Sequence, residues 1–466
     1  MATTATKPLD PQEVEALAGG VRGRVIQPED GGFAQACALW NGTVVRRPAL
    51  IVQARGPADV IAAVTFARSQ HLPLSVRGGG HNVAGHALCD GGVAIDLSGM
   101  RGVRIDPLRR RARVEGGATL GDVDHEAQAH ALATPFGVVS RTGVGGLTLH
   151  GGLGFLTRKF GLTCDNLVGA DVVTADGRLV TADLDHNADL LWALRGGGGN
   201  FGVVTSLEYQ LHPLGPDVWM FIVMYPVAEA PRVFRFFRDY MPTAPEDLMA
   251  IAILWNSPHG DPIPEAARNQ PVVILAGAHS GPFDEGERAV APFRQVATPL
   301  VDFSGPMPFV QAQRLFDADY PDGRRYYWKS LYLDSLDDAA VSTLVDQAQR
   351  RPSTLSSVDV WALGGALRRE PPGGSAFSHR DRPYLLGIEA NWDDAGDDGR
   401  NIDWARGVLA DMQRFSKGGL YLNFPGLVEE GDALLRQSFG ASYDRLRAVK
   451  AKYDPENLFR STFNIR

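Results

Sequence analysis

The sequence predicts an α+β protein with more than one domain. Its 466 residues exceed what one hydrophobic core can hold, because single cores stop growing at roughly 250–300 residues. Residues 48–77 have the pattern of a strand, a helix and a second strand, and residues 103–114 alternate as in a hairpin. After His212-Pro213, strand patterns alternate with amphipathic helices and glycine becomes rarer. A second domain therefore begins near this point.

The elements of the first domain can be assigned in chain order. Asp10 and Pro11 mark the start of the first helix as N-cap and first helical residue, and Gly19-Gly20 mark its end. The elements expected after it are strands at 48–54, 74–77, 93–97 and 203–211, helices at 58–69 and 120–131, and hairpins at 103–114 and after Asp165-Asn166. The first two strands and the helix between them form a βαβ unit.

The second domain is expected to contain strands at 219–223, 249–255 and 272–275, followed by aromatic and polar runs at 326–329 and 361–370. The sequence is therefore divided into a first domain at 1–214, a second domain at 215–417 and a C-terminal segment at 418–466.

Charge and composition exclude several classes of protein. The net charge of −8 leaves no basic excess to neutralise phosphates, so no nucleic-acid partner is expected. The N-terminus has no apolar signal-like run and no stretch approaches the ~18 apolar residues of a membrane span. Three scattered cysteines form no disulfide framework, which favours a reducing, cytoplasmic location. A monomer and a homodimer are both compatible with these features.

The most specific pattern is a glycine loop at the end of the strand at 74–77. Gly78, Gly79 and Gly80 leave no Cβ in the way, so the backbone can lie directly against a ligand. Consecutive N–H groups in such a loop can converge on phosphate oxygens, and Arg77 adds a positive charge. His81 ends the loop. This order of strand, glycine triplet and histidine predicts a ligand site.

Further clusters follow in a fixed order. After Arg77-Gly-Gly-Gly-His81 the chain contains Thr142-Gly-Val-Gly-Gly146, Gly151-Gly-Leu-Gly-Phe155, Gly161-Leu-Thr-Cys-Asp-Asn166, Gly198-Gly-Asn-Phe-Gly-Val-Val-Thr205 and Tyr453-Asp-Pro-Glu-Asn-Leu-Phe-Arg460. This series resembles the berberine bridge enzyme-like branch of the vanillyl-alcohol oxidase/p-cresol methylhydroxylase superfamily. The bacterial hydroxynicotine oxidases and polyketide-tailoring flavoenzymes are the members that it most resembles. The resemblance covers nearly the whole chain and is weakest in the second domain.

The resemblance implies a fold and a cofactor. Residues 1–214 would form a two-part FAD-binding domain, and residues 215–417 a substrate domain whose antiparallel sheet, covered by helices, lies over the flavin ring. Residues 418–466 would return to the FAD domain. His81 would be bonded to the flavin 8α-methyl group. Some members carry a second link from a cysteine, but Val139 occupies that position here, so a single link is expected.

The implied cofactor contacts come from the glycine clusters and a few residues around them. They are Arg77, Gly78, Gly79, Gly80, His81, Asn82, Gly85, Val139, Thr142, Gly143, Gly145, Gly146, Gly151, Gly152, Gly154, Phe155, Asp165, Asn166, Val203, Val204, Tyr421, Asn423 and Asn464. Thr142 replaces a valine or leucine that gates oxygen in relatives. Its hydroxyl could bond near flavin N5, or the small side chain could leave a permissive oxygen gate.

The chemistry also requires a group that takes a proton from the substrate. Tyr421, in a Tyr-x-Asn segment like that of the family, is the first candidate, and a nearby cation, Lys329 or Arg368, would have to lower its pKa. Glu389, on a predicted strand, is an alternative acid or base. An aromatic pocket is expected to draw on Tyr326, Tyr327, Trp328 and Trp361. The catalytic candidates are thus Tyr421, Lys329, Tyr327 and Thr142.

Other readings of these motifs are weaker. His81, His86 and Cys89 match no zinc spacing and lack a fourth ligand, so no metal is expected. The glycine triplet lacks the pattern of a nicotinamide fingerprint. The favoured hypothesis is a cytoplasmic FAD-linked oxidase. It would remove a hydride from a C–H beside a hydroxyl or amine of a small secondary metabolite or catabolic substrate and reduce O2 to H2O2. A dehydrogenase, an internal monooxygenase and a non-catalytic flavin- or drug-binding protein remain alternatives.

Overall fold

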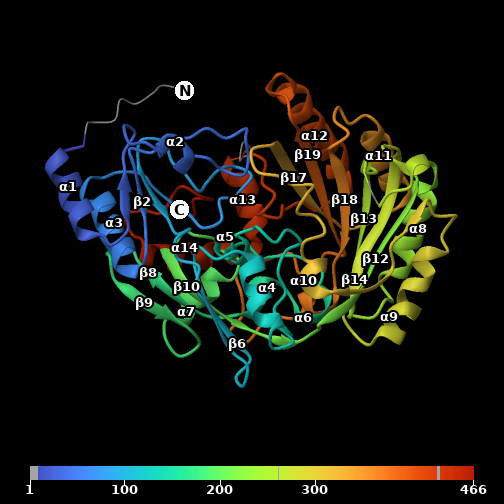
Figure 1. The fold of residues 1–466 in the computed structure, drawn as a ribbon, viewed down its shortest axis with the longest axis horizontal. Coiled ribbons are helices and arrows are strands. Elements are labelled where there is room, and N and C mark those ends of the chain that lie inside the picture. The colour runs from blue at the N-terminus through green and yellow to red at the C-terminus, as the bar shows by residue number, and fades with distance from the viewer. Residues whose placement is uncertain (1–8, 261, 428–430) are drawn as a thin grey trace.

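The computed structural model describes residues 9–260, 262–427 and 431–466. Figure 1 shows two lobes side by side. One lobe holds the blue-to-green N-terminal part together with the red helices α13 (Gly431–Phe439) and α14 (Tyr443–Tyr453), and the other holds the yellow-to-orange part. The chain therefore leaves the first lobe, builds the second and returns.

The first sheet contains the βαβ unit predicted from the sequence. Its order is β1-β2-β4-β3, with β2, β4 and β3 parallel and β1 antiparallel at the edge. The strands are β1 (Arg24–Ile26), β2 (Leu50–Gln53), β3 (Leu74–Arg77) and β4 (Val93–Asp96), and the helices on this part are α1 (Pro11–Gly20), α2 (Phe33–Ala36) and α3 (Pro57–Ser69). All of β4 is buried, which suits a parallel strand covered on both faces.

The second sheet is antiparallel, in the order β5-β6-β10-β8-β9. Its strands are β5 (Val103–Asp106), β6 (Arg111–Glu115), β8 (Leu167–Val173), β9 (Leu179–Ala182) and β10 (Val203–Gln210). The elements around it are α4 (Leu120–Gln128), α5 (Val144–Leu149), α6 (Thr157–Phe160), a short 3-10 turn at Thr163–Asn166, α7 (Ala188–Leu194) and the paired strands β7 (Leu132–Ala133) and β11 (His212–Pro213). Thr119 and Asp122 close a capping box that starts α4.

The second lobe is built on an eight-stranded antiparallel sheet in the order β15-β12-β14-β13-β18-β19-β17, with β16 paired to β12. The strands are β12 (Asp217–Pro226), β13 (Leu248–Asn256), β14 (Pro271–His279), β15 (Val301–Asp302), β16 (Gly305–Pro308), β17 (Arg325–Leu333), β18 (Ser357–Ala362) and β19 (Tyr384–Trp392). The helices are α8 (Ala230–Tyr240), α9 (Phe283–Val290), α10 (Phe309–Ala312), α11 (Asp338–Gln349) and α12 (Asp398–Met412). The predicted α+β class and the helix-covered antiparallel sheet are confirmed.

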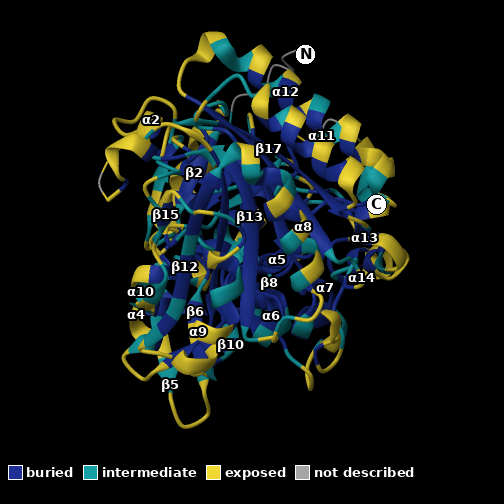
Figure 2. Cartoon of the chain, turned by 90° about the vertical axis from the view of Figure 1, so that its right-hand side faces the viewer, coloured by how far each residue is buried: buried dark blue, intermediate teal, exposed yellow. Residues whose placement is uncertain are grey.

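The large sheet has two differently covered faces. On one face, Tyr327, Val360 and Ile388 belong to a core shared with α8, α11 and α12. On the other face, Ile251 and Trp361 pack toward residues of the first lobe. Figure 2 shows the strands of this sheet in the dark blue of buried residues and the helices banded with exposed yellow. The face away from the helices is therefore the one that can meet a ligand.

A buried lysine of the C-terminal segment, Lys450, holds this segment to the first lobe. Lys450 Nζ lies 2.6 Å from Asp454 Oδ2 and also donates to the carbonyls of Asn200 and Phe459. Leu446 of α14 shares a hydrophobic core with residues of β6, β8 and β10. The division at residues 214 and 417 stays a prediction, and this packing supports it.

Candidate active site

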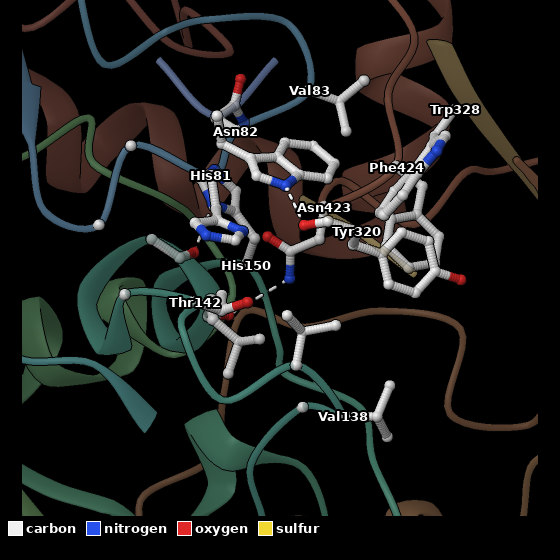
Figure 3. Close-up of a pocket in the computed structure, with 18 of the residues that line it drawn as sticks. His81, Asn82, Val83, Val138, Thr142, His150, Tyr320, Trp328, Asn423 and Phe424 are labelled. Atoms are coloured by element: carbon white, nitrogen blue, oxygen red, sulfur yellow. Dashed lines mark hydrogen bonds between the residues drawn. The ribbon is translucent and has the colours of Figure 1, made fainter. Parts of the chain in front are cut away.

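A cavity of about 450 Å³ lies where the glycine loops of the first lobe face the large sheet. One wall consists of residues 78–82, 139, 142–143, 145–146 and 202–204, and the other of side chains from β13, β17, β18 and β19. Tyr421, Asn423 and Phe424 of the returning segment close one side. Figure 3 shows His81, Thr142 and His150 on one side of this space and Tyr320, Trp328 and Phe424 on the other.

The first wall is backbone. The loop after β3 and the loop before α5 touch directly, since a Cβ on Gly79 would lie 2.4 Å from the N atom of Gly143, and one on Gly143 would lie 2.3 Å from that of Gly79. Gly146 and Gly199, by contrast, have no atom within 4 Å of a Cβ position and also line the cavity. Close contact behind the loops and open space in front of them make a cradle for a ligand.

His81 lies at the edge of this cradle. Its ring stacks on Trp40 at a centroid distance of 5.0 Å, and Trp40 stacks in turn on Tyr326 at 3.8 Å. Burial lowers the pKa of His81 to about 4, so the imidazole is neutral at physiological pH. A neutral, fixed imidazole suits the nucleophile that a covalent flavin link requires.

The cavity also has a polar end lined by Ser75, His86, His150 and Thr462. Each of these side chains has a buried polar atom without a hydrogen-bond partner in the described part of the chain, including Nδ1 of His86 and Nε2 of His150. Nδ1 of His150 contacts the carbonyl of Gly146 at 3.1 Å. Buried polar atoms without partners are costly in a native protein. Together with the glycine cradle, they fit a cofactor that carries phosphate and sugar groups.

Tyr421 and Asn423 occupy the side of the cavity between its two walls. The hydroxyl of Tyr421 accepts from the backbone N–H of Gly152 at 3.0 Å and from Nδ2 of Asn423 at 2.9 Å. Ser330, on β17, bonds to the backbone of Tyr421 and fixes this segment against the sheet. Burial raises the pKa of Tyr421 to about 12. Neither Lys329 nor Arg368 is among the lining residues, so the cation expected beside Tyr421 is not there.

A carboxylate pair lies on the sheet wall. Glu389, on β19, is in register with Trp328 of β17 and with Ser357 of β18, and Asp359 is two residues further along β18. Tyr320 donates to Oε2 of Glu389 at 2.7 Å, and Ser357 donates to Oδ1 of Asp359 at 2.9 Å. Burial raises the pKa of Asp359 to about 6, and burial together with the neighbouring Asp359 raises the pKa of Glu389 well above its usual range. The pair therefore shares a proton near neutral pH.

Many of the predicted cofactor residues line the cavity. They are Gly78, Gly79, Gly80, His81, Asn82, Val139, Thr142, Gly143, Gly145, Gly146, Val203, Val204, Tyr421 and Asn423. Of the aromatic residues expected in a pocket, Trp328 and Trp361 are in the lining.

Tyr327 and Lys329 are not in the lining, which argues against their predicted catalytic role. Side chains alternate across a strand, so these two residues of β17 point to the face opposite Trp328. Tyr327 lies in the core beneath the helices, where Nε of Arg406 approaches its hydroxyl at 3.3 Å. The Nζ atom of Lys329 lies 3.4 Å from the carbonyl of Pro425. The aromatic run suggested a pocket, but only every second residue of it faces one.

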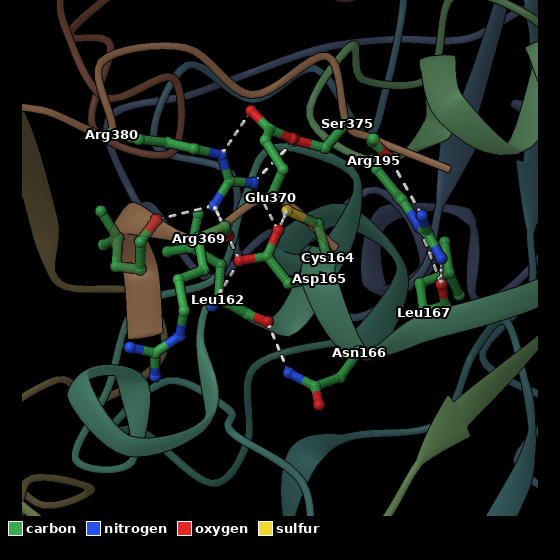
Figure 4. Close-up of polar contacts among 12 residues, drawn as sticks. Leu162, Cys164, Asp165, Asn166, Leu167, Arg195, Arg369, Glu370, Ser375 and Arg380 are labelled. Atoms are coloured by element: carbon green, nitrogen blue, oxygen red, sulfur yellow. Dashed lines mark hydrogen bonds and ion pairs between the residues drawn. The ribbon is translucent and has the colours of Figure 1, made fainter. Parts of the chain in front are cut away.

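Asp165 and Asn166 also lie outside the lining and have structural partners. Asp165 forms a buried ion pair with Arg380, whose Nη1 is 3.0 Å from Oδ2 of Asp165. Asn166 donates to the carbonyls of Phe160 and Leu162 at 2.9 Å each. Figure 4 shows the carboxylate of Asp165 among Arg380, Cys164 and Leu162. Asp165 therefore joins the two lobes through Arg380, whereas Asn166 bonds to a loop of its own lobe.

The remaining predicted residues support the cavity from behind. None of them is in the lining, but two contact lining residues: Phe155 packs near Phe316, and Gly152 donates to Tyr421. The others contact other residues: Arg77 donates to the carbonyl of Ala36, Gly85 faces Val44, Gly151 faces Phe377, and Gly154 faces the carbonyl of Phe136. Asn464 is two residues after Thr462 of the lining. Cys164 is fully buried and also lies outside the lining.

Some lining residues were missed by sequence reasoning, namely Trp40, Tyr320, His150 and Asp359. Asp359 had a usable signal, because a charged residue in the apolar run Ser356-Ser-Val-Asp-Val-Trp361 is unusual in a buried strand. Trp40 and Tyr320 reach the site from loops, and nothing in their local sequence marks them. Among the described residues, no group of three or more His, Cys, Asp and Glu side chains could hold a metal ion.

The chain has two lobes that enclose a cavity with a wall of glycine loops on one side and a broad sheet on the other. This arrangement is typical of FAD-binding oxidoreductases. An FAD binding domain model matches residues 48–183, and a model described as berberine and berberine-like matches residues 420–466. The (R)-6-hydroxynicotine oxidase of Paenarthrobacter nicotinovorans is 32% identical over 461 residues, which is 96% of this chain and 97% of that protein.

Solved structures agree with this class. The 6-hydroxy-D-nicotine oxidase of Arthrobacter nicotinovorans superimposes with a TM-score of 0.86 at 29% identity, over 96% of this chain and 98% of that one. A glucooligosaccharide oxidase of Acremonium strictum, which carries a 6-S-cysteinyl, 8α-N1-histidyl FAD, has the same fold, with a TM-score of 0.85 at 24% identity over 97% of this chain and 99% of that one. The chain belongs to the berberine bridge enzyme-like family of FAD-linked oxidoreductases, and it binds FAD. None of the described helices is both long and apolar enough to cross a membrane.

Proposed function

We propose that this protein is an FAD-dependent oxidase of small molecules, which removes a hydride from a C–H beside a hydroxyl or amine and reduces O2 to H2O2. The observation that supports this proposal best is the arrangement of the cavity, in which a backbone cradle with His81 faces a wall with a proton-sharing carboxylate pair. FAD, when bound, supplies the hydride acceptor and returns the electrons to oxygen. The chain's own residues supply binding, orientation and proton transfer.

We propose that His81 carries a single covalent link to FAD. Its burial keeps the imidazole neutral, and its stacking on Trp40 fixes the direction of the ring. Val139, at the position where some relatives carry a second linking cysteine, lines the cavity and offers no nucleophile. Cys164 lies outside the lining and its pKa is raised well above the usual range by burial, so it does not replace the missing cysteine.

We propose that the Asp359–Glu389 pair, and not Tyr421, accepts the substrate proton. A neutral phenol with its pKa raised by burial is a poor base, and its oxygen already accepts two hydrogen bonds. A carboxylate pair that shares one proton retains one negative charge and can take another proton near neutral pH. Tyr421 then orients the cofactor side of the site, together with Asn423.

The test is mass spectrometry on the denatured protein, followed by anaerobic reduction and reoxidation. The mass is expected to rise by one FAD, attached to the peptide that contains His81, and reoxidation of the reduced protein is expected to release one H2O2 per flavin. Slow reoxidation by O2 would favour the dehydrogenase alternative. Fast reoxidation with substrate present and no peroxide, with one oxygen atom in the product and the other released as water, would favour the oxygenase. A flavin that no alcohol or amine reduces would favour a binding protein instead.

A further inference from the structure

The sheet wall of the cavity contains a charged centre in apolar surroundings. Asp359 lies opposite Ile253 of β13 and opposite Gly387 of β19, and Glu389 lies opposite Trp328 of β17. Residues directly opposite on neighbouring antiparallel strands share a face, so the two acids lie in one patch of the wall. Gly387 adds no side chain beside Asp359, which leaves room for a ligand to approach it.

Aromatic rings flank this patch on both sides. Trp361 is two residues from Asp359 on the same face of β18, and Trp328 adjoins Glu389. Edge-to-face contacts fix the ring of Trp328 against Tyr320 and Phe424, each at a centroid distance of 5.3 Å. A buried negative charge between aromatic faces is the environment that binds an organic cation, because both the charge and the ring quadrupoles attract it.

A second observation points to a ligand at this patch that carries a hydrogen-bond acceptor in addition to its charged nitrogen. Trp361 lines the cavity and is only 4% exposed, and its Nε1 has no hydrogen-bond partner in the described part of the chain. Trp255 and Trp328, also in the lining, both have partners for their Nε1 atoms, namely the carbonyl of Leu355 and the side chain of Asn391. A buried indole N–H without a partner is uncommon.

We propose that the substrate is an amine that binds as a cation, with its charged nitrogen against the Asp359–Glu389 pair and between the rings of Trp328 and Trp361. This inference rests on the proposed oxidase function and names the substrate class for it. The side chains next to the acids are mainly apolar, namely Ile251, Ile253 and the indoles, and this favours an organic cation over a sugar at this patch. Polar side chains such as Asn256, Ser257 and Asn391 also line the cavity, so the experiment below includes a sugar.

Other charged groups in the lining do not cancel this preference. Arg324 is the cation on this side, and its guanidinium donates to Asp393 at 2.9 Å and to the carbonyl of Asp319 at 3.0 Å. The carboxyl of Asp319 adds a further acidic group, and Tyr320 is a neutral donor to Glu389. His259 also lines the cavity, from the loop after β13. Among the described lining residues, the acidic groups therefore outweigh Arg324, whose guanidinium is already paired with Asp393.

The experiment compares a cation with a neutral molecule of the same shape. Choline and 3,3-dimethyl-1-butanol are titrated into the flavin-loaded protein without oxygen, and binding is measured by calorimetry. Choline is expected to bind at least about tenfold more tightly. Asp359→Asn is expected to remove most of this preference and to leave the affinity for the neutral alcohol within about twofold. Asp338→Asn removes an equal charge from the exposed, opposite side of the sheet and is expected to change neither affinity.

Two outcomes would overturn the proposal. One is equal binding of choline and its neutral analogue, and the other is tight binding of cellobiose in place of both. If Asp359→Asn fails to fold, Glu389→Gln tests the same pair, and its fold is checked by circular dichroism. The flavin absorbance of each sample is recorded as well. A flavin-loaded protein that neutral alcohols reduce but that shows no preference for choline retains the proposed oxidase function and contradicts only the cation site.

Discussion

The two walls of the cavity achieve recognition by opposite means. The glycine wall presents backbone, with Gly79 and Gly143 in contact behind it and open space in front of Gly146. The sheet wall presents side chains, with Glu389 and Asp359 set among Trp328, Trp361 and isoleucines. Backbone N–H groups suit phosphates, which every FAD carries, whereas side chains can be exchanged without disturbing the strands. The cofactor wall is therefore tied to a sequence motif, and the substrate wall is free to vary.

The largest expected effect concerns the cofactor wall. His81→Ala is expected to abolish the covalent link completely, because the other imidazoles of the described lining, His86 and His150, lie at the polar end that fits phosphate and sugar groups. Intact-protein mass spectrometry after denaturation checks this. His130→Ala, at an exposed position outside the cavity, serves as the matched control and should retain the link. A flavin adduct that survives in His81→Ala would show that the cofactor is attached elsewhere.

The next largest effect is expected on the free energy of unfolding, when the Asp165–Arg380 ion pair that joins the two lobes is broken. Asp165→Asn removes the buried carboxylate that pairs with Arg380 and leaves only the half-exposed Glu370 beside it. Breaking a buried ion pair costs about 3–5 kcal/mol, and the loss is expected at the lower end of this range. Chemical denaturation measures the loss in the free energy of unfolding. Glu246→Gln removes the exposed pair with Arg369 and should cost less than about 1 kcal/mol. Equal effects of the two variants would mean that the connection is not stabilising.

A smaller effect is expected for alanine substitutions on the cofactor wall, where some glycines are packed against backbone and others face open space. Gly79→Ala places a methyl group against the backbone of Gly143, which cannot move aside easily, so a loss of about 1–3 kcal/mol is expected. Gly146→Ala adds the same methyl group into open space and should not destabilise the protein without flavin. It should instead weaken noncovalent FAD binding. Thermal melting and flavin titration, both on the His81→Ala background, distinguish the two losses.

The smallest effect is a pH dependence of stability on the sheet wall. The pKa of Asp359 rises from 3.8 in the ordinary carboxyl to about 6 in the folded protein, so the folded state binds more protons than the unfolded state between these values. Its contribution to stability is present below about pH 4 and is lost as the pH rises through 6. The melting temperature of Asp359→Asn minus that of the wild type should therefore be larger at pH 8 than at pH 4. A difference in melting temperature that does not change with pH would contradict the shared proton.

Sequence reasoning predicted more residues of the cofactor wall than of the sheet wall. The residues of the glycine motifs lie mostly where the resemblance placed them, because such a motif encodes backbone shape over a few consecutive residues. Asp165 and Asn166 are exceptions, since their side chains serve the protein's own loops. On the sheet wall, Glu389 was only an alternative and Asp359 was missed. Tyr327 and Lys329 were expected there, but Tyr327 lies in the core under the helices and Lys329 lies against Pro425. The register that brings Asp359 beside Glu389 joins residues from different strands, and no local pattern records it.

The sequence by itself determined the α+β class, the FAD family and the histidine at the end of the glycine loop. The class depends on local periodicity, and the family and the histidine depend on the resemblance of consecutive glycine motifs to those of a known family, which a chain shows without its tertiary structure. Only the tertiary structure decided which face of β17 meets the cavity, which acids share a proton, and that Asp165 joins the lobes instead of touching the cofactor. Those properties arise from strand alternation and from burial, which change the protonation and the partners of a side chain without changing its identity.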